Sequence, residues 1–176
     1  MAPGVPARTR EWGMRTADRG EFEQVFRSGY PSVLRTAYLV LHDRGRAEEV
    51  TQDGFLRLYQ RWSQAVSYDH PVAWVRKVVV RDAIRRAERE RRQQPGLVLV
   101  DREANDRLPD LDLLQALAEL PSRQRAAVVL FYLEDRPVDE IADLMDVSAS
   151  TVKQHLHQGR KRLSQVLVGG VVGDVG

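Results

Sequence analysis

Apolar residues recur at spacings of three and four along this chain, and this period constrains its fold more than any other feature. In the first half, Phe22, Val25 and Phe26 begin a pattern that continues through Leu34 and Leu41. Such a period places side chains on one face of an α-helix, whereas a half-buried strand requires strict alternation. We therefore predict an all-α fold, in which amphipathic helices pack their apolar faces together.

A stretch that contains two Pro and one Gly, residues 93–109, interrupts the helical period. Because proline and glycine break helices, this stretch predicts a flexible linker. The predicted fold is then two small helical domains, residues 20–92 and residues 110–168. Residues 1–19 lack an apolar period and are predicted to be a disordered N-terminal segment, and the glycine-containing residues 169–176 are predicted to be a flexible tail.

Individual residues predict some of the helix ends in the first domain. Asp43 is expected to cap a helix at about residues 47–62, because a carboxylate in that position accepts a backbone N–H. Pro71 follows a break in the pattern and is expected to open a helix that runs into an Arg-rich end. Pro31 is interpreted as lying near a helix start, where its missing N–H costs little.

Composition excludes several classes of protein. The chain of 176 residues contains no cysteine, so disulfides, zinc–thiolate sites and cysteine nucleophiles are excluded. Its first twenty residues lack the apolar core of a signal peptide, and its longest apolar stretches are too short to cross a bilayer. We expect a cytoplasmic protein without membrane insertion.

Catalytic and metal-binding patterns are also missing from the sequence. The carboxylates of Asp139 and Asp143 lie four residues apart on a surface helix, with no neighbouring base or glycine-rich phosphate loop. His155 and His157 are two residues apart on a helix, so their side chains diverge by roughly 200° instead of converging on a metal ion. We predict no enzymatic activity, no cofactor and no metal site.

The net charge of +2 hides an alternation of basic and acidic segments. Residues 74–92 carry a net charge of +5, and residues 153–162 carry four basic residues and no acid. Residues 101–119 and 134–146 carry net charges of −4 and −5. Two separated basic segments predict two contacts with a polyanion, although each run alone is also typical of a solvated helix face. A further hypothesis is that the acidic segments occlude the basic helices in the free protein.

Residues 137–163 have the pattern of a helix-turn-helix. A short amphipathic helix is followed by a turn at residues 146–148 and by a helix that places Val152 inward; either Ser148 or Ser150 is expected to cap this second helix. A helix of this kind fits the major groove of DNA, with its N-terminal residues on base edges and its later basic residues on phosphates. The predicted DNA-binding residues of the second helix are Ser150, Thr151, Lys153, Gln154, His157, Arg160 and Lys161.

Four motifs resemble those of extracytoplasmic-function sigma factors, in particular the actinobacterial, sigma-E-like group. Residues 47–59 resemble conserved region 2.2, residues 70–92 resemble regions 2.3 and 2.4, residues 117–125 resemble the opening of region 4, and residues 148–163 resemble region 4.2. The order and spacing of the four motifs are more specific than any one motif. The resemblance implies a sigma factor, which binds core RNA polymerase and directs promoter-specific initiation through the −10 and −35 elements.

The resemblance also implies partners. The helix at residues 47–62 would dock on the clamp of the polymerase β′ subunit, and the second domain would contact the β flap and read the −35 element of promoter DNA as duplex. An anti-sigma factor that covers the polymerase-binding surfaces is a further possible partner. The predicted polymerase-binding residues are Glu49, Gln52, Asp53 and Leu56.

The helix at residues 74–92 would help to open the −10 element and hold its non-template strand. Arginine and lysine side chains along this helix suit phosphate contacts, and an aromatic side chain can stack on a base. Trp74 continues the apolar stripe, so we favour a core position for it over stacking on a base. The predicted −10 residues are Trp74, Arg76, Lys77, Arg81, Arg85 and Arg86.

One other class of binding protein fits the same helix-turn-helix. A stand-alone transcriptional regulator would bind DNA without polymerase, and its N-terminal half would serve as a sensing or dimerisation domain. The region 2.2-like helix distinguishes the two functions, because a free-standing regulator needs no polymerase-docking face.

Overall fold

The computed structural model describes residues 16–65, 70–96 and 110–172, and every regular element in these ranges is helical. The first domain consists of α1 (Thr16–Leu41), α2 (Arg44–Gln60), α3 (Trp62–Ala65) and α4 (Pro71–Gln93). The second domain consists of α5 (Leu111–Ala118), α6 (Ser122–Val128), the π-helix η1 (Val129–Leu133), α7 (Val138–Met145) and α8 (Ala149–Val172). The predicted all-α fold with two helical domains is confirmed. The predicted linker lies mostly outside the described residues.

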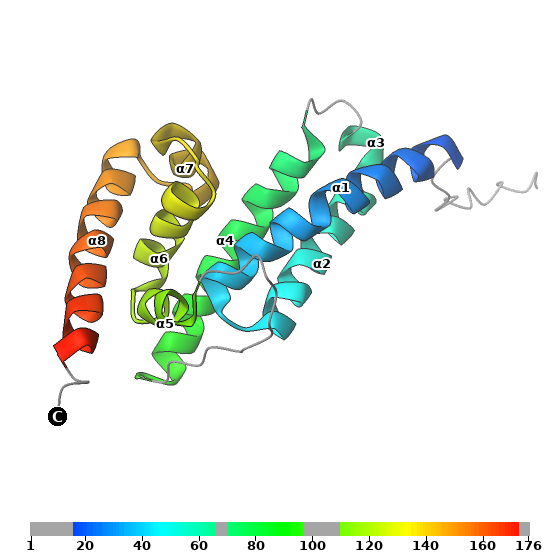
Figure 1. Cartoon of the computed structure of the whole chain (residues 1–176). Coiled ribbons are helices and arrows are strands. Elements are labelled where there is room, and N and C mark those ends of the chain that lie inside the picture. The colour runs from blue at the N-terminus through cyan, green and yellow to red at the C-terminus, as the bar shows by residue number, and fades with distance from the viewer. Residues whose placement is uncertain (1–15, 66–69, 97–109, 173–176) are drawn as a thin grey trace, which may run out of the picture.

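The core of the first domain forms where α1, α2 and α4 lie side by side (Figure 1). Phe55 and Leu58 of α2 and Val75 and Val79 of α4 are fully or almost fully buried. These residues repeat at spacings of three and four, which places them on one face of each helix. Asp43 caps α2, since its Oδ1 accepts the backbone N–H of Arg46 at 2.9 Å. The predicted cap is confirmed, and the helix begins a few residues earlier than expected.

Two predictions for α1 were wrong. Pro31 lies inside α1 and not near a helix start. Pro31 is exposed, so water can bond the carbonyl that its missing N–H leaves free. The apolar residues on both sides of it pack against α2 and α4, and this packing holds the helix together. The helix also begins at Thr16, so residues 16–19 are helical and not disordered.

The second domain is built on α8, which packs against α5, α6 and α7. Gly159 lets α8 approach α6 closely, because a Cβ at this position would lie 2.7 Å from Cγ2 of Val128. Helix α8 continues to Val172, four residues into the stretch that the sequence predicts as a flexible tail. An existing helix gains one hydrogen bond for each residue that it adds, so it can extend through two glycines where no proline stops it.

The two domains are in contact. The second domain packs through α6 and α7 against α4, and through α6 and η1 against α1. Figure 1 shows α4 between the other long helices of the first domain and the helices of the second. The helix-turn-helix is therefore held beside the Arg-rich helix of the first domain.

Candidate nucleic-acid interface

A short turn joins α7 to α8 and sets the geometry of the helix-turn-helix. Asp146 adopts the left-handed conformation, with φ 59° and ψ 49°, which glycine usually occupies in such turns. Aspartate tolerates this conformation better than most residues. Ser148 caps α8, since its Oγ accepts the backbone N–H of Thr151 at 3.2 Å. Of the two expected caps, the structure selects Ser148.

The outer face of α8 is open to solvent. Val152 and Leu156 are buried against the rest of the second domain, as the sequence predicts. The predicted base and phosphate readers lie on the other side of the helix, where Thr151 is half-buried and the others are exposed. One of them has a partner on another element, since Arg160 donates to the Tyr132 hydroxyl at 3.3 Å. The exposed predicted readers are Ser150, Lys153, Gln154, His157, Arg160 and Lys161.

A second basic surface, the α4 stripe, consists of Lys77, Arg81 and Arg85, which are four residues apart on one face of α4. In contrast to the face of α8, much of this stripe is covered. Lys77 pairs with the Asp143 carboxylate of α7. Arg81 donates to the backbone carbonyl of Asp143 at 2.8 Å. Arg85 is exposed and pairs within its own helix with Asp82 at 3.3 Å.

Arg76, which the sequence predicts to contact phosphate, is turned away from solvent in this arrangement of the domains. Its guanidinium is buried and donates to the hydroxyls of Ser32 and Thr36 on α1, at 3.1 and 3.0 Å. It also donates to the carboxylate of Glu134 at 3.1 Å, from the end of η1. Arg76 directly precedes Lys77 of the α4 stripe. One step along a helix turns the side chain by roughly 100° around the helix axis, so Arg76 faces α1 and not the side of the stripe.

Trp74 and Arg86 also have structural roles. Trp74 is half-buried and packs against the apolar core, which agrees with the preference stated from its sequence pattern. Arg86 pairs with Glu49 of α2 at 2.6 Å and with Glu90 at 3.6 Å. A hydrogen bond to Glu49 raises the pKa of Arg86. A predicted DNA contact and a predicted polymerase contact are thus partners of each other.

The residues predicted to bind polymerase lie on the exposed side of α2, and this side is called the polymerase face after that prediction. Exposed acidic and amide residues recur along this side at spacings of three and four, and two exposed apolar residues continue the same spacing. Leu56 is 52% exposed and Tyr59 is 42% exposed, and their spacing of three places them side by side on the helix as a small apolar patch. Tyr59 was missed from the sequence, although its spacing from Leu56 was a usable signal. The members of the polymerase face are Glu49, Gln52, Asp53, Leu56 and Tyr59.

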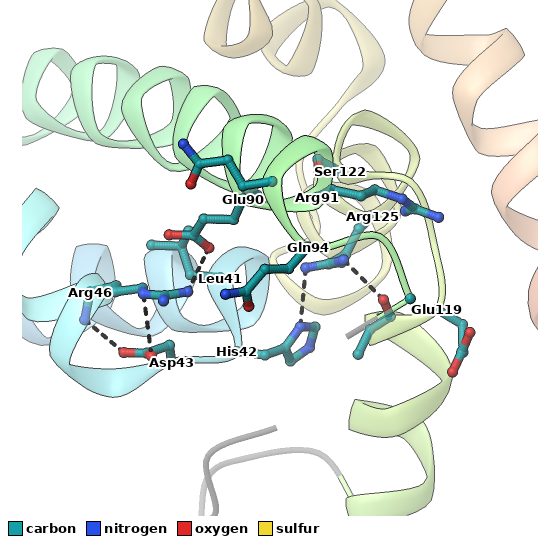
Figure 2. A pocket seen from close by; sticks show the side chains of 14 residues that line it. Leu41, His42, Asp43, Arg46, Glu90, Arg91, Gln94, Glu119, Ser122 and Arg125 are labelled. Carbon is teal, nitrogen blue, oxygen red and sulfur yellow. Dashed lines mark hydrogen bonds and ion pairs between the residues drawn. The ribbon is translucent and has the colours of Figure 1, made fainter. Parts of the chain in front are cut away.

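A cavity of about 260 Å³ lies where the α1–α2 corner, the end of α4 and the start of the second domain meet (Figure 2). Arg125 borders it and donates to the carbonyl of Val40 at 2.6 Å, near the C-terminal end of α1. The same guanidinium donates to the carbonyls of Ala118 and Leu120 at 3.0 Å and contacts Nδ1 of His42 at 3.3 Å. One cation thus satisfies carbonyls at the ends of helices in both domains.

Burial explains the titration behaviour of this corner. Desolvation, and then the Arg125 guanidinium, lower the pKa of His42 to about 3. Desolvation, and then the charge of Arg91, lower the pKa of Arg125 to about 10. At neutral pH His42 is therefore uncharged, and it is an acceptor for Arg125. No role was predicted for either residue, because residues 83 positions apart have no signature in a local pattern.

Two features are missing from the described residues. No helix in these ranges is long and apolar enough to cross a membrane. No group of three or more His, Asp or Glu side chains in the same ranges is placed to hold a metal ion.

A helix-turn-helix beside a separate helical domain with a basic stripe defines a class of two-domain DNA-binding proteins of transcription. The chain matches the family model "Sigma-70 region 2" over residues 25–93 and "Sigma-70, region 4" over residues 110–163. It is 30% identical to the RNA polymerase sigma-E factor of Streptomyces coelicolor, over 84% of this chain and 86% of that one. It is also 30% identical to the ECF RNA polymerase sigma factor SigM of Mycobacterium tuberculosis, over 85% and 79% of the two chains.

Among solved structures, the fold is similar to the sigma factor RpoE of Bartonella quintana in complex with the anti-sigma factor NepR. The TM-score is 0.65 at 21% identity, over 84% of this chain and 96% of that one. The chain belongs to the sigma-70 family, among the extracytoplasmic-function sigma factors.

Proposed function

We propose that this chain binds core RNA polymerase through the polymerase face of α2 and brings it to promoters that its two basic surfaces recognise. The observation that carries the proposal is the exposure of Leu56 and Tyr59 among acidic neighbours on α2. Exposed apolar residues with a charged rim are typical of a protein-binding surface. The proposed partner is the β′ clamp of the polymerase. Acting with polymerase, the protein works in the cytoplasm and catalyses no reaction itself.

The −35 element is the proposed ligand of α8. The N-terminal part of the exposed face offers Lys153 and Gln154, which suit hydrogen bonds to base edges in the major groove. The later part offers Arg160 and Lys161, which suit phosphates. The proposed contact that holds the second domain in place on the DNA is the β flap of the polymerase.

The −10 element is the proposed ligand of the α4 stripe. Lys77, Arg81 and Arg85 follow one line along the helix, as contacts to the phosphates of a single strand require. Arg76 is left out of this set because it is buried. An anti-sigma factor remains a proposed regulator, supported by the similarity of the fold to a sigma factor bound to one.

Run-off transcription with core polymerase tests the proposal. The wild-type chain is expected to give promoter-dependent transcripts. Leu56→Asp is expected to reduce them at least tenfold by weakening polymerase binding, because a charge replaces the apolar centre of the contact. Gln24→Asp, which adds the same single charge at an exposed position of α1, is the control for an added charge away from the polymerase face. DNA binding by the chain alone, with no transcript at any promoter, would favour the stand-alone regulator instead.

A further inference from the structure

The acidic side of α7 lies on the α4 stripe. Asp143 pairs with Lys77, and the Asp146 carboxylate lies 3.4 Å from Nη2 of Arg81. The backbone adds to this cover, since Arg81 also donates to the carbonyls of Asp143 and Leu144, at 2.8 and 3.2 Å. Two of the three cations of the stripe are therefore occupied by the second domain.

A buried charge pair holds this contact at its inner edge. Glu134 and Arg76 are each 8% exposed at the side chain and lie 3.1 Å apart. A second cation, Arg35 of α1, donates to the other oxygen of Glu134 at 3.2 Å. The π-turn η1 places Glu134 here, with its backbone N–H bonded to the carbonyl of Val129. Removing one member of a buried pair leaves an uncompensated charge, so Glu134 contributes more to the contact than exposed pairs do.

The cover is selective. The outer face of α8 is exposed, and so are Gln52, Asp53 and Leu56 of the polymerase face. Of these three surfaces, only the α4 stripe lies under the other domain in the ranges that the structure describes; the acidic residues 101–109 lie outside these ranges. The acidic segment at residues 134–146 thus covers the basic helix of the first domain and leaves the outer face of α8 free. The hypothesis from charge alone was that acidic segments occlude both basic helices.

We propose that the free chain masks its own −10-binding stripe by docking the acidic side of α7 on α4, with the Glu134–Arg76 pair as the buried contact that holds the α7 end of this arrangement closed. The proposal rests on the function proposed above and names the regulation of its −10 site. Polymerase can bind the open face of α2, and the second domain must then leave α4 before the stripe can hold single-stranded DNA. The acidic side of α7 occupies the same cations that the phosphates need, so the two cannot bind at once.

A zero-length cross-link tests the closed arrangement in the full chain. A carbodiimide joins an amine to a carboxylate only where the two are already in contact, and Lys77 is the only lysine of the first domain among the three in the chain. Lys77 and Asp143 are both accessible to the reagent, with side chains 34% and 65% exposed. We expect a Lys77–Asp143 cross-link in monomeric product, detected by mass spectrometry after digestion. Its absence from the free wild-type chain would overturn the proposal.

Binding of single-stranded DNA tests the masking. The probe is a fluorescent single strand of mixed sequence, measured by anisotropy at fixed salt without polymerase. Glu134→Gln is expected to bind about tenfold more tightly than wild type, because the affinity rises with the fraction of open molecules. Asp139→Asn, the same change of charge at an exposed position of α7, is expected to bind like wild type. Equal affinities for wild type and Glu134→Gln would refute the masking.

A second variant covers the case in which Glu134→Gln disturbs folding, which circular dichroism detects. Asp143→Asn removes the exposed partner of Lys77 without leaving a buried charge, and it is expected to raise single-strand affinity about threefold. No gain with this variant would also count against the masking. Failure of the proposed function is distinct, since it appears as absent run-off transcription while these polymerase-free measurements still decide the masking.

Discussion

Gly54 sets how closely α2 and α4 approach each other. A Cβ at this position would lie 2.5 Å from Cγ2 of Val79 and 3.3 Å from Cγ1 of Val75. The shorter distance is well inside van der Waals contact, so a larger residue requires the two helices to shift. Glycine within a helix costs roughly 0.5–1 kcal/mol relative to alanine. The close packing of the two helices, and not a local preference, therefore accounts for glycine at this position.

Gly54→Ala is expected to lower the free energy of unfolding by about 1–3 kcal/mol, because the added methyl overpacks the α2–α4 contact. Gly20→Ala is the control, since Gly20 is exposed in α1 and no atom lies within 4 Å of an added Cβ. That change is expected to stabilise the protein by up to about 1 kcal/mol. Urea denaturation measures both changes. If Gly54→Ala also raised the free energy of unfolding, α2 and α4 would have to lie farther apart than in the structure.

At the scale of the element, α8 combines two kinds of surface on one helix. Its inner face packs Val152 and Leu156 into the second domain, and its outer face carries polar and basic residues. The cap at Ser148 satisfies one N–H at the helix start, the end that would enter the major groove. In the proposed function, residues near this start read bases and residues a few turns later bind phosphates.

Two substitutions in α8 separate these roles on −35 duplex DNA. Gln154→Ala is expected to cost about 1–3 kcal/mol of binding and to relax the sequence preference at one base pair. Lys161→Ala is expected to weaken binding to all sequences alike and to lower the slope of log affinity against log salt by about 1. Anisotropy with a set of duplexes that differ at single positions, repeated at several salt concentrations, measures both effects. The same salt slope for both variants, with no change of preference, would contradict this division of α8.

At the scale of the whole molecule, buried polar groups fasten the two domains at both ends of their contact. Glu134 meets Arg76 at one end, and Arg125 meets His42 and the carbonyl of Val40 at the other. Buried polar groups of this kind are costly when unpaired, so they favour one arrangement of the domains over slightly shifted ones. They also make the contact sensitive to conditions that change a charge.

Stability is expected to fall in acid because of His42. Its pKa is about 3 in the folded protein and 6.5 ordinarily. The unfolded chain therefore takes up a proton below pH 6.5 that the folded protein does not, and stability is lost as the pH falls from 6.5 toward 3. Between about pH 7.5 and about pH 5.5 the loss from this residue is about 1 kcal/mol.

His42→Asn is expected to remove this part of the pH dependence. Asparagine keeps an acceptor for Arg125 and tolerates the positive φ of 55° at this position, but it does not titrate. His157→Asn is the control, because His157 is exposed on α8. Urea denaturation at the two pH values measures the difference. An unchanged pH dependence in His42→Asn would show that His42 already titrates normally in the folded protein.

Local patterns in the sequence determined the helices, the cap at Asp43, the inward face of α8 and the division into two domains, because each depends on residues a few positions apart. The family followed from four such motifs in order. The burial of Arg76 and the pairing of Arg86 with Glu49 were not predictable from the sequence. Both residues lie in an Arg-rich helix, and no local pattern distinguishes them from its exposed arginines.

Only the tertiary structure decided which basic surface is free and which is covered. The acidic segment at residues 134–146 was visible from its charge, but its partner was not, because Glu134 and Arg76 are 58 residues apart along the chain. Charge attracts any opposite charge over a similar range, so composition cannot select among basic helices. Packing of α7 on α4 selects one of them, and that contact distinguishes the covered α4 stripe from the open outer face of α8.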